Sequence, residues 1–337
     1  MSDKSAIEWT DATWNPTTGC EKISQGCKHC YAERQWPRLS ANPKATKYFA
    51  RAFTDVLCHE DVLDQPLRWT RPRKIFVNSM SDLFHPAVPF EFIDRVFAVM
   101  ALTTTRSRNN NGRHIFQVLT KRPARMVEYL LGIQDEDKDM HRWADAAADI
   151  AGGRYAQHCV ERWDWPLPNV WLGVSAEDQA TANERIPLLL KAPAAVRWVS
   201  AEPLLGPIDL TWEDRADGMV VDRFPAIDWL VVGGESGPKA RAMHPEWVRS
   251  LRDQCVTAGV AFHFKQWGEW AGATVHGDDG FAGGAYVEVP GGKTAIDYAH
   301  NWRDGSASVR VGKKVAGREL DGRTWDEYPW ALAGEGG

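Results

Sequence analysis

Short apolar runs alternate with longer segments of helical character along most of this chain. The runs are rich in β-branched and aromatic residues and each ends in polar residues, as buried strands do. The expected strands cover residues 12–17, 74–78, 114–119, 170–174, 196–200, 229–232 and 261–265. The expected helices cover residues 89–102, 124–131, 180–190 and 245–258. This alternation predicts βαβ units and a parallel sheet.

Polar or glycine-containing turns follow most of the expected strands. These turns are NSMSD at 78–82, TKR at 120–122, SAED at 175–178, AEP at 201–203 and GGES at 233–236. In parallel α/β folds, ligands bind at the carboxyl ends of the strands, where such turns converge. We therefore expect the functional site at this edge of the sheet.

The repeat predicts an α/β fold, with a partial or complete TIM-like (β/α) barrel over residues 1–270. Residues 132–168 interrupt the repeat with an acidic stretch and the helix-like run MHRWADAAADIA, which indicates an insertion. Residues 271–337 are glycine-rich at first and predict a small hairpin-bearing extension that packs on the barrel.

Composition narrows the classes of function without naming one. The 337 residues include 40 Lys and Arg against 45 Asp and Glu, a net charge of -5. This balance argues against a protein whose whole surface binds nucleic acid. The N-terminal segment has no apolar core, and no stretch approaches the length of a membrane span. We expect a cytoplasmic protein without membrane contact.

Three of the six cysteines lie close together, in the pattern C-x6-C-x2-C at Cys20, Cys27 and Cys30. Three thiolates on one loop can hold three irons of a [4Fe–4S] cluster and leave the fourth iron open to a ligand. A structural zinc site is the alternative, and it would need His29 or Cys58 as a fourth ligand. The cysteine count favours iron–sulfur but leaves both metals open.

A series of longer motifs carries a family resemblance. In chain order they are WNPTTGCEKISQGCKHCYAE, VNSMSDLFHP, FQVLTKRP, LGVSAED, SAEPLLGP, VVGGESGPKAR and GRELDGRTWDEYP. Together they resemble the three-cysteine-motif family found widely in bacteriophages and prophages, a group similar to radical S-adenosylmethionine (SAM) proteins. The chain departs from the common radical SAM pattern in its six-residue first spacing and in Tyr31, which follows the last cysteine instead of preceding it.

The resemblance implies a barrel of the radical SAM type, with a [4Fe–4S] cluster on the three cysteines and SAM as the second cofactor. It also places SAM-binding residues at the ends of the strands. The candidates are Asn78, Ser79 and Asp82 after the second strand, Ser175 and Glu177 after the fourth, Glu202 after the fifth, and Gly233, Gly234 and Glu235 after the sixth. The alternative is that Ser79 and Asp82 cap the following helix and that the two glycines form a simple turn.

Basic residues at the same edge suggest what the substrate carries. Residues 31–74 hold nine Lys or Arg and five Asp or Glu, a local positive surplus in an acidic chain. Lys121, Arg122 and Arg241 follow expected strands, and such charges suit a phosphate-bearing substrate. With the phage association, this predicts a nucleobase or nucleotide modified in phage DNA. A peptide or a small amine is the alternative substrate.

The implied function is reductive cleavage of SAM to methionine and a 5′-deoxyadenosyl radical, in the cytoplasm of a bacterial host. This chemistry requires an electron donor, and family members can be encoded beside a dedicated partner protein. Two other functions remain open: a zinc-bearing nucleic-acid-binding protein without catalysis, and a phage nuclease in which the cluster is only structural.

Overall fold

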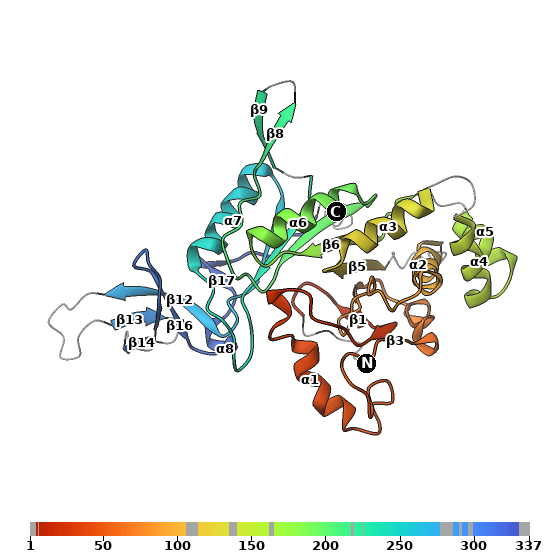
Figure 1. Ribbon diagram of the computed structural model, residues 1–337, viewed down its shortest axis with the longest axis horizontal. Helices are drawn as coiled ribbons and strands as arrows, with labels where there is room; N and C mark the ends of the chain where they lie inside the picture. Colours follow the sequence, from red (N-terminus) through yellow and green to blue (C-terminus); the bar gives the residue numbers. More distant parts are fainter. Residues whose placement is uncertain are drawn as a thin grey trace. The chain divides into compact units, whose positions relative to one another are not determined.

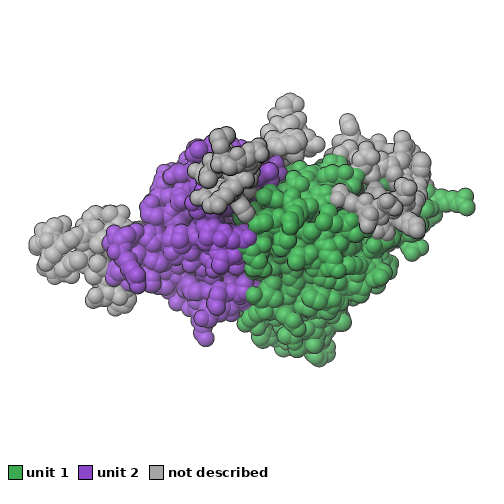
Figure 2. All heavy atoms as spheres, turned by 45° about the horizontal axis from the view of Figure 1, so that its top comes forward, with its two compact units in different colours: residues 1–23, 32–174, 184–198 green, residues 24–31, 175–183, 199–337 purple. Residues whose placement is uncertain are grey.

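The computed structural model describes most of the chain. The described residues are 5, 7–105, 114–134, 140–161, 165–216, 219–224, 226–276, 286–289, 292–295 and 299–329. Among the helices in these ranges, none has both the length and the apolar character needed to cross a membrane. The described residues divide into two compact units: residues 1–23, 32–174 and 184–198 form unit 1, and residues 24–31, 175–183 and 199–337 form unit 2 (Figure 2).

The main sheet is parallel and curled, which is consistent with a partial β/α barrel (Figure 1). Its seven strands follow the order β1-β4-β5-β6-β7-β10-β11. Their bounds are β1 Ala12–Trp14, β4 Lys74–Val77, β5 Ile115–Thr120, β6 Val170–Ser175, β7 Val196–Ala201, β10 Trp229–Gly233 and β11 Ala261–Gln266. The α/β fold and the parallel sheet expected from the sequence are confirmed.

The first expected strand is wrong in its extent. Strand β1 ends at Trp14, and Thr17–Thr18 forms a separate strand, β2, that pairs antiparallel with β3 at Leu57–Cys58. Pro16 lies between the two strands, and a proline has no N–H to give to a sheet ladder. The break therefore turns the chain away from the main sheet just before Cys20.

The helices of unit 1 lie mostly where the pattern placed them. They are α1 Tyr31–Ser40, α2 Phe90–Thr105, α3 Pro123–Gln134, α4 Met140–Ala151, α5 Arg154–Glu161 and α6 Gln179–Lys191, with short 3-10 turns at Glu60–Val62 and Gln65–Arg68. Tyr31 of α1 and residues 179–183 of α6 are assigned to unit 2. The expected insertion contains α4 and α5.

Buried polar contacts attach the insertion to α2. Arg142 donates to Asp94 Oδ2 at 2.9 and 2.7 Å, and Tyr129 donates to Asp94 Oδ1 at 2.8 Å. Trp143 donates to the Tyr129 hydroxyl at 2.8 Å. A buried carboxylate is stable only when such donors surround it, so this network fixes the place of α4.

Tryptophan side chains form much of the core beside the main sheet. The Trp9 ring lies 4.8 Å from Phe76 and 5.2 Å from Trp198, both edge-on. A Cβ at Gly173 would lie 2.5 Å from the Trp198 ring, so only glycine fits beneath that indole. Aromatic packing of this kind explains the high tryptophan content without assigning it a chemical role.

Unit 2 contains β10, β11 and a helix with clear end signals. Helix α7, Pro245–Ala258, begins after His244, whose Nδ1 accepts a hydrogen bond from Glu246 N, and ends at Gly259 with φ 68°. Its buried face includes Val248, Leu251 and Cys255, which recur at helical spacing, whereas Val256, which the apolar pattern also includes, is exposed. The bounds of α7 agree with the expected range.

The C-terminal part of unit 2 is largely antiparallel. A five-stranded sheet has the order β14-β13-β12-β16-β15. Its strands are β12 Trp270–His276, β13 Tyr286–Val289, β14 Gly292–Ala295, β15 Ala299–Asn301 and β16 Ala307–Arg310. The remaining elements are the hairpin β8 Trp212–Ala216 with β9 Met219–Arg223, the short helix α8 Lys313–Ala316, and the hairpin β17 Glu319–Leu320 with β18 Arg323–Thr324.

Residues after β18 cover the edge of the main sheet. Phe264 N of β11 donates to Trp325 O at 2.9 Å, and Glu327 N donates back to Phe262 O at 3.3 Å. Glu327 Oε2 also accepts from Phe262 N at 3.0 Å, and Trp229 Nε1 donates to Glu327 O at 2.9 Å. An uncovered edge strand is a template for aggregation, and this segment removes that hazard from β11.

Candidate functional site

The three cysteines belong to the segment between β2 and α1, residues 19–30, which we call the cysteine loop. It starts at Gly19, where φ is +92° and an added Cβ would lie 2.3 Å from Asp55 O. Gly19 N donates to Met80 O at 3.3 Å, and Cys20 N donates to Phe53 O at 2.9 Å. These backbone contacts hold Cys20 beside the turn that follows β4. Later in the loop lies the 3-10 turn η1, Gln25–Cys27.

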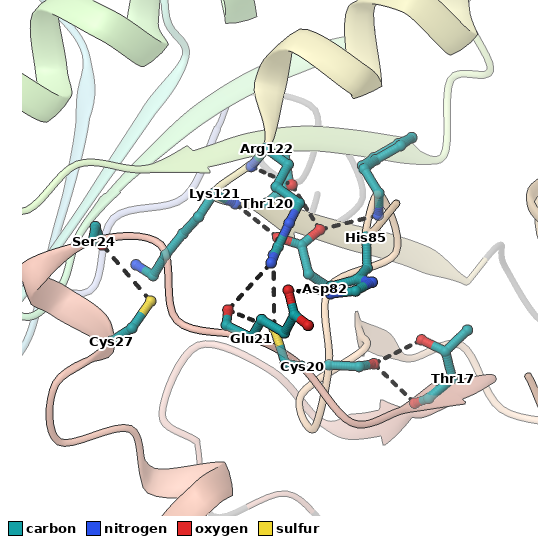
Figure 3. A network of polar contacts seen from close by, with 12 residues as sticks. Thr17, Cys20, Glu21, Ser24, Cys27, Asp82, His85, Thr120, Lys121 and Arg122 are labelled. Carbon is teal, nitrogen blue, oxygen red and sulfur yellow. Dashed lines mark hydrogen bonds and ion pairs between the residues drawn. The ribbon is translucent and has the colours of Figure 1, made fainter. Parts of the chain in front are cut away.

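Arg122 contacts Cys20 from the turn after β5. Its Nη1 lies 3.7 Å from Cys20 Sγ and 3.1 Å from Asp82 Oδ2, and its Nη2 donates to Glu21 O at 3.2 Å (Figure 3). Burial lowers the pKa of Arg122, but the Asp82 carboxylate and the Cys20 sulfur outweigh burial and raise it above its ordinary value. Arg122 is therefore a fixed positive charge at the Cys20 sulfur.

Asp82 joins the ends of β4 and β5. Its Oδ1 accepts hydrogen bonds from Thr120 Oγ1 at 2.7 Å and from Phe84 N at 3.0 Å. Its Oδ2 accepts from Lys121 N at 3.0 Å and from Arg122 (Figure 3). Protein donors thus engage both oxygens of this buried carboxylate. The bond to Phe84 N is a local turn contact and not a helix cap, since α2 begins only at Phe90. A SAM contact by Asp82 stays a prediction.

Asn78 has features typical of a ligand site. It follows β4 with φ 61°, in the left-handed region that non-glycine residues rarely adopt. Its side chain is buried; Oδ1 accepts from Thr17 N at 3.4 Å, while Nδ2 has no hydrogen-bond partner among the described residues. Ser79 Oγ donates to Asn15 Oδ1 at 3.1 Å. Asn78 therefore keeps one unused, buried donor at the carboxyl end of β4.

His85 belongs to the Cys20 side of the site, although the sequence offered no reason to choose it. The ring is buried, Nδ1 accepts from Ala87 N at 3.1 Å, and Nε2 lies 3.9 Å from Glu21 Oε2. Burial and the charge of Arg122 lower the pKa of His85. A histidine in a loop is more often structural than a ligand, and no spacing in the sequence relates residue 85 to residue 21.

In unit 2, Glu177 lies against the second part of the cysteine loop. Its Oε1 accepts from Ser24 Oγ at 3.0 Å, and the same hydroxyl lies 3.7 Å from Cys27 Sγ. The Glu177 side chain is fully buried, and a Cβ at Gly26 would lie 2.3 Å from its Oε1. Glu177, which the resemblance names as a SAM-binding candidate, therefore contacts the loop that carries the cysteines.

Arg241 and Glu235 hold the same part of the loop. Arg241 Nε and Nη2 donate to the two Glu235 oxygens at 2.9 and 2.6 Å, and Arg241 N donates to Oε2 at 2.8 Å. Nη2 also donates to Gln25 O at 3.0 Å. Burial raises the pKa of Glu235, but the Arg241 hydrogen bonds outweigh burial and lower it overall. A paired guanidinium thus connects the turn after β10 to the cysteine loop.

Packing against the protein accounts for the glycine turn. A Cβ at Gly234 would lie 1.9 Å from Trp267 O, and a Cβ at Gly233 would lie 3.1 Å from Glu202 Oε1. Glu202 in turn accepts from Lys265 Nζ at 2.6 Å. The alternative of a simple turn explains both glycines, while SAM contacts by these residues and by the buried Ser175 stay predictions.

Thiol chemistry separates the three loop cysteines from other cysteines. Cys20, Cys27 and Cys30 are half-buried and form no disulfide. By contrast, burial and the nearby Glu60 raise the pKa of Cys58 to about 11, and burial raises the pKa of Cys255. Because metals bind the thiolate, these raised pKa values make Cys58 and Cys255 poor ligands. The side chain of Cys159 is not among those that the structure describes.

Among the residues that the structure describes, no group of three or more His, Cys, Asp or Glu side chains is gathered as metal ligands. The donor chemistry still fits a thiolate-bound cluster, since three half-buried thiols share one loop and Arg122 supplies positive charge at one of them. A structural zinc site would need a fourth ligand in addition to the three thiols.

Comparison with known proteins adds one finding. Residues 4–329 match the family described as "Protein of unknown function (DUF5131)". Searches of curated proteins and of solved structures gave no match.

Proposed function

This chain belongs to the DUF5131 family of unknown function, and from that premise we propose that it is a radical SAM enzyme. In this proposal Cys20, Cys27 and Cys30 bind a [4Fe–4S] cluster, and SAM is the second cofactor. The curled parallel sheet, with the candidate residues in the turns after its strands, is compatible with this class but does not distinguish it from other β/α folds.

The observation that carries the proposal is the use of buried charge to hold the cysteine loop. In unit 1, Arg122 contacts Cys20 and is paired with Asp82. In unit 2, Glu177 contacts Ser24, and Arg241, which is paired with Glu235, contacts Gln25. Burying charged groups is costly unless they gain strong partners. Their placement along a loop with three half-buried thiols supports a role in presenting those thiols to a metal.

The cluster, when bound, supplies the electron that breaks a carbon–sulfur bond of SAM and leaves methionine and a 5′-deoxyadenosyl radical. The residues of the chain then have three tasks: to hold the thiolates, to orient SAM and to exclude water from the radical. Asn78 Nδ2 is a donor that has no partner among the residues the structure describes, so it suits an oxygen of the ligand, such as a carboxylate, and not an ammonium.

We further propose a nucleotide or nucleobase substrate, as in phage DNA modification. Two of the basic residues predicted to bind a phosphate give this proposal less support than the sequence suggested. The guanidiniums of Arg122 and Arg241 are both bound to carboxylates of the protein. Substrate contacts by Lys121, Arg122 and Arg241 stay predictions. Comparing nucleosides of phage or host DNA by mass spectrometry, with active protein and with Cys27→Ala, tests it; identical nucleosides would favour a peptide or small amine.

The metal and the reaction are tested together by anaerobic reconstitution. We expect four irons and four sulfides per chain, an iron–sulfur spectrum, and 5′-deoxyadenosine when SAM and dithionite are added. Cys20→Ala, Cys27→Ala and Cys30→Ala should each abolish all three, whereas Cys58→Ala and Cys255→Ala should not. A colourless protein with one zinc, or loss of metal in Cys58→Ala alone, would contradict the proposal.

A further inference from the structure

Arg122 occupies an unusual position for a residue expected to bind substrate. One of its nitrogens is shared between the Cys20 sulfur and Asp82, and the other binds the backbone of Glu21. Its side chain is only 11% exposed. The guanidinium therefore points at a metal-ligating sulfur and is fixed there on three sides by protein groups.

We propose that Arg122 is a positioning residue that makes the bound cluster easier to reduce, by donating a hydrogen bond to the Cys20 sulfur. The inference rests on the proposed function. It assigns Arg122 to the cluster instead of to a phosphate of the substrate.

The physical reason is the charge that the cluster gains on reduction. One electron taken from an external reductant adds negative charge to the iron–sulfur core and its thiolates. A guanidinium donor at one sulfur stabilises that added charge more than it stabilises the oxidised form. Because Arg122 is mostly shielded from water, salt and solvent screen this interaction weakly.

Asp82 holds the Arg122 guanidinium in its orientation toward Cys20. Its carboxylate accepts from Arg122 and also from Thr120 and the Lys121 backbone, so it is itself fixed by β5. This anchoring limits the number of orientations open to the guanidinium. Lysine at position 122 would keep the charge but could not contact Asp82, Cys20 and Glu21 with one planar group.

A redox titration of the reconstituted protein, monitored by electron paramagnetic resonance, tests the inference. Arg125→Gln is the matched control, because Arg125 lies three residues further on, in α3, where it donates to Val88 O at 2.8 Å and lies 4.3 Å from the Phe90 ring. For Arg122→Gln we expect a midpoint potential about 60 mV lower, a tenfold change for a one-electron couple. The midpoint potential of Arg122→Lys should lie between that of Arg122→Gln and that of the parent. The midpoint potential of Arg125→Gln should equal that of the parent.

Each outcome decides between the two proposals. A parent protein that takes up no iron contradicts the proposed function, whatever Arg122 does. A parent that binds the cluster while Arg122→Gln keeps the same potential and iron content overturns the inference alone. If Arg122→Gln does not fold, as judged by circular dichroism, Arg122→Lys decides, and an unchanged potential in that variant also overturns it. Weaker binding of inorganic phosphate with an unchanged potential would return Arg122 to the substrate.

Discussion

Gly26 is the position where one added methyl group tests the packing of the cysteine loop. A Cβ there would lie 2.3 Å from Glu177 Oε1 and 2.4 Å from Glu177 Cγ. Because Glu177 is fully buried, it cannot move into open space, and either its side chain or the loop must shift. Overpacking of a filled site costs about 1–3 kcal/mol. We expect Gly26→Ala to lower the free energy of unfolding by that amount.

Urea denaturation followed by tryptophan fluorescence measures this change. Gly132→Ala is the control, since Gly132 lies in helix α3, and an added Cβ there meets nothing within 4 Å. In a helix, alanine is more favourable than glycine by about 0.5–1 kcal/mol. The same chemical change should therefore stabilise the protein at position 132 and destabilise it at position 26.

The contact with Glu177 can be isolated by a double-mutant cycle. In a Glu177→Ala background, the atoms that oppose the new methyl group are gone, so Gly26→Ala should cost less than about 0.5 kcal/mol. An equal cost for Gly26→Ala in both backgrounds would refute the reasoning, because the strain would then arise elsewhere in the loop. A stabilising effect of Gly26→Ala in the parent would refute it as well.

Three further predictions concern stability. Burial, Lys47 and Arg51 depress the pKa of His59 to about 4, so its contribution should be present above pH 6.5 and lost as the pH falls towards 4; urea midpoints across this range should drop less in His59→Asn. Arg142→Ala removes a charged donor from the buried Asp94 and should cost about 1.5–3 kcal/mol in the same assay, whereas an unchanged midpoint would contradict the anchoring of α4. Truncation after Gly317 exposes the edge of β11 and should increase light scattering at high protein concentration, and a clear solution would count against edge protection.

Strand and helix positions in the main sheet could be predicted because each strand is a short apolar run with a polar end. Six of the expected strands agree with the observed bounds to within one residue at each end, including β6 at Val170–Ser175 and β10 at Trp229–Gly233. The first strand failed because the pattern of apolar residues continues past Pro16, whereas the backbone pairing does not. The pattern of hydrophobic residues indicates which residues are buried, but it does not indicate which neighbouring strand they pair with through backbone hydrogen bonds.

The place of the candidate site, at the carboxyl ends of the strands, could be predicted from the sequence. The ion pairs that its charged side chains form could not. The sequence pattern correctly predicts that Arg122 and Arg241 lie near the carboxyl ends of the strands, since both residues follow strands. It could not show that their guanidiniums bind Asp82 and Glu235, because one pair is separated by 40 residues and the other crosses an irregular turn. Gly26 carried no visible signal either, because its need for a small residue comes from Glu177, 151 residues away. Charge pairing of this kind depends on tertiary contacts.

The composition of the cysteine loop explains why charged residues hold it. Its one branched aliphatic residue, Ile23, is 46% exposed, so the loop has little apolar surface to bury against the sheet. A segment without such an anchor keeps one conformation only through directed polar contacts, and charge-assisted hydrogen bonds from rigid strand ends are the strongest of these. Strand-end charges that would ordinarily indicate ligand binding are therefore engaged in shaping the loop.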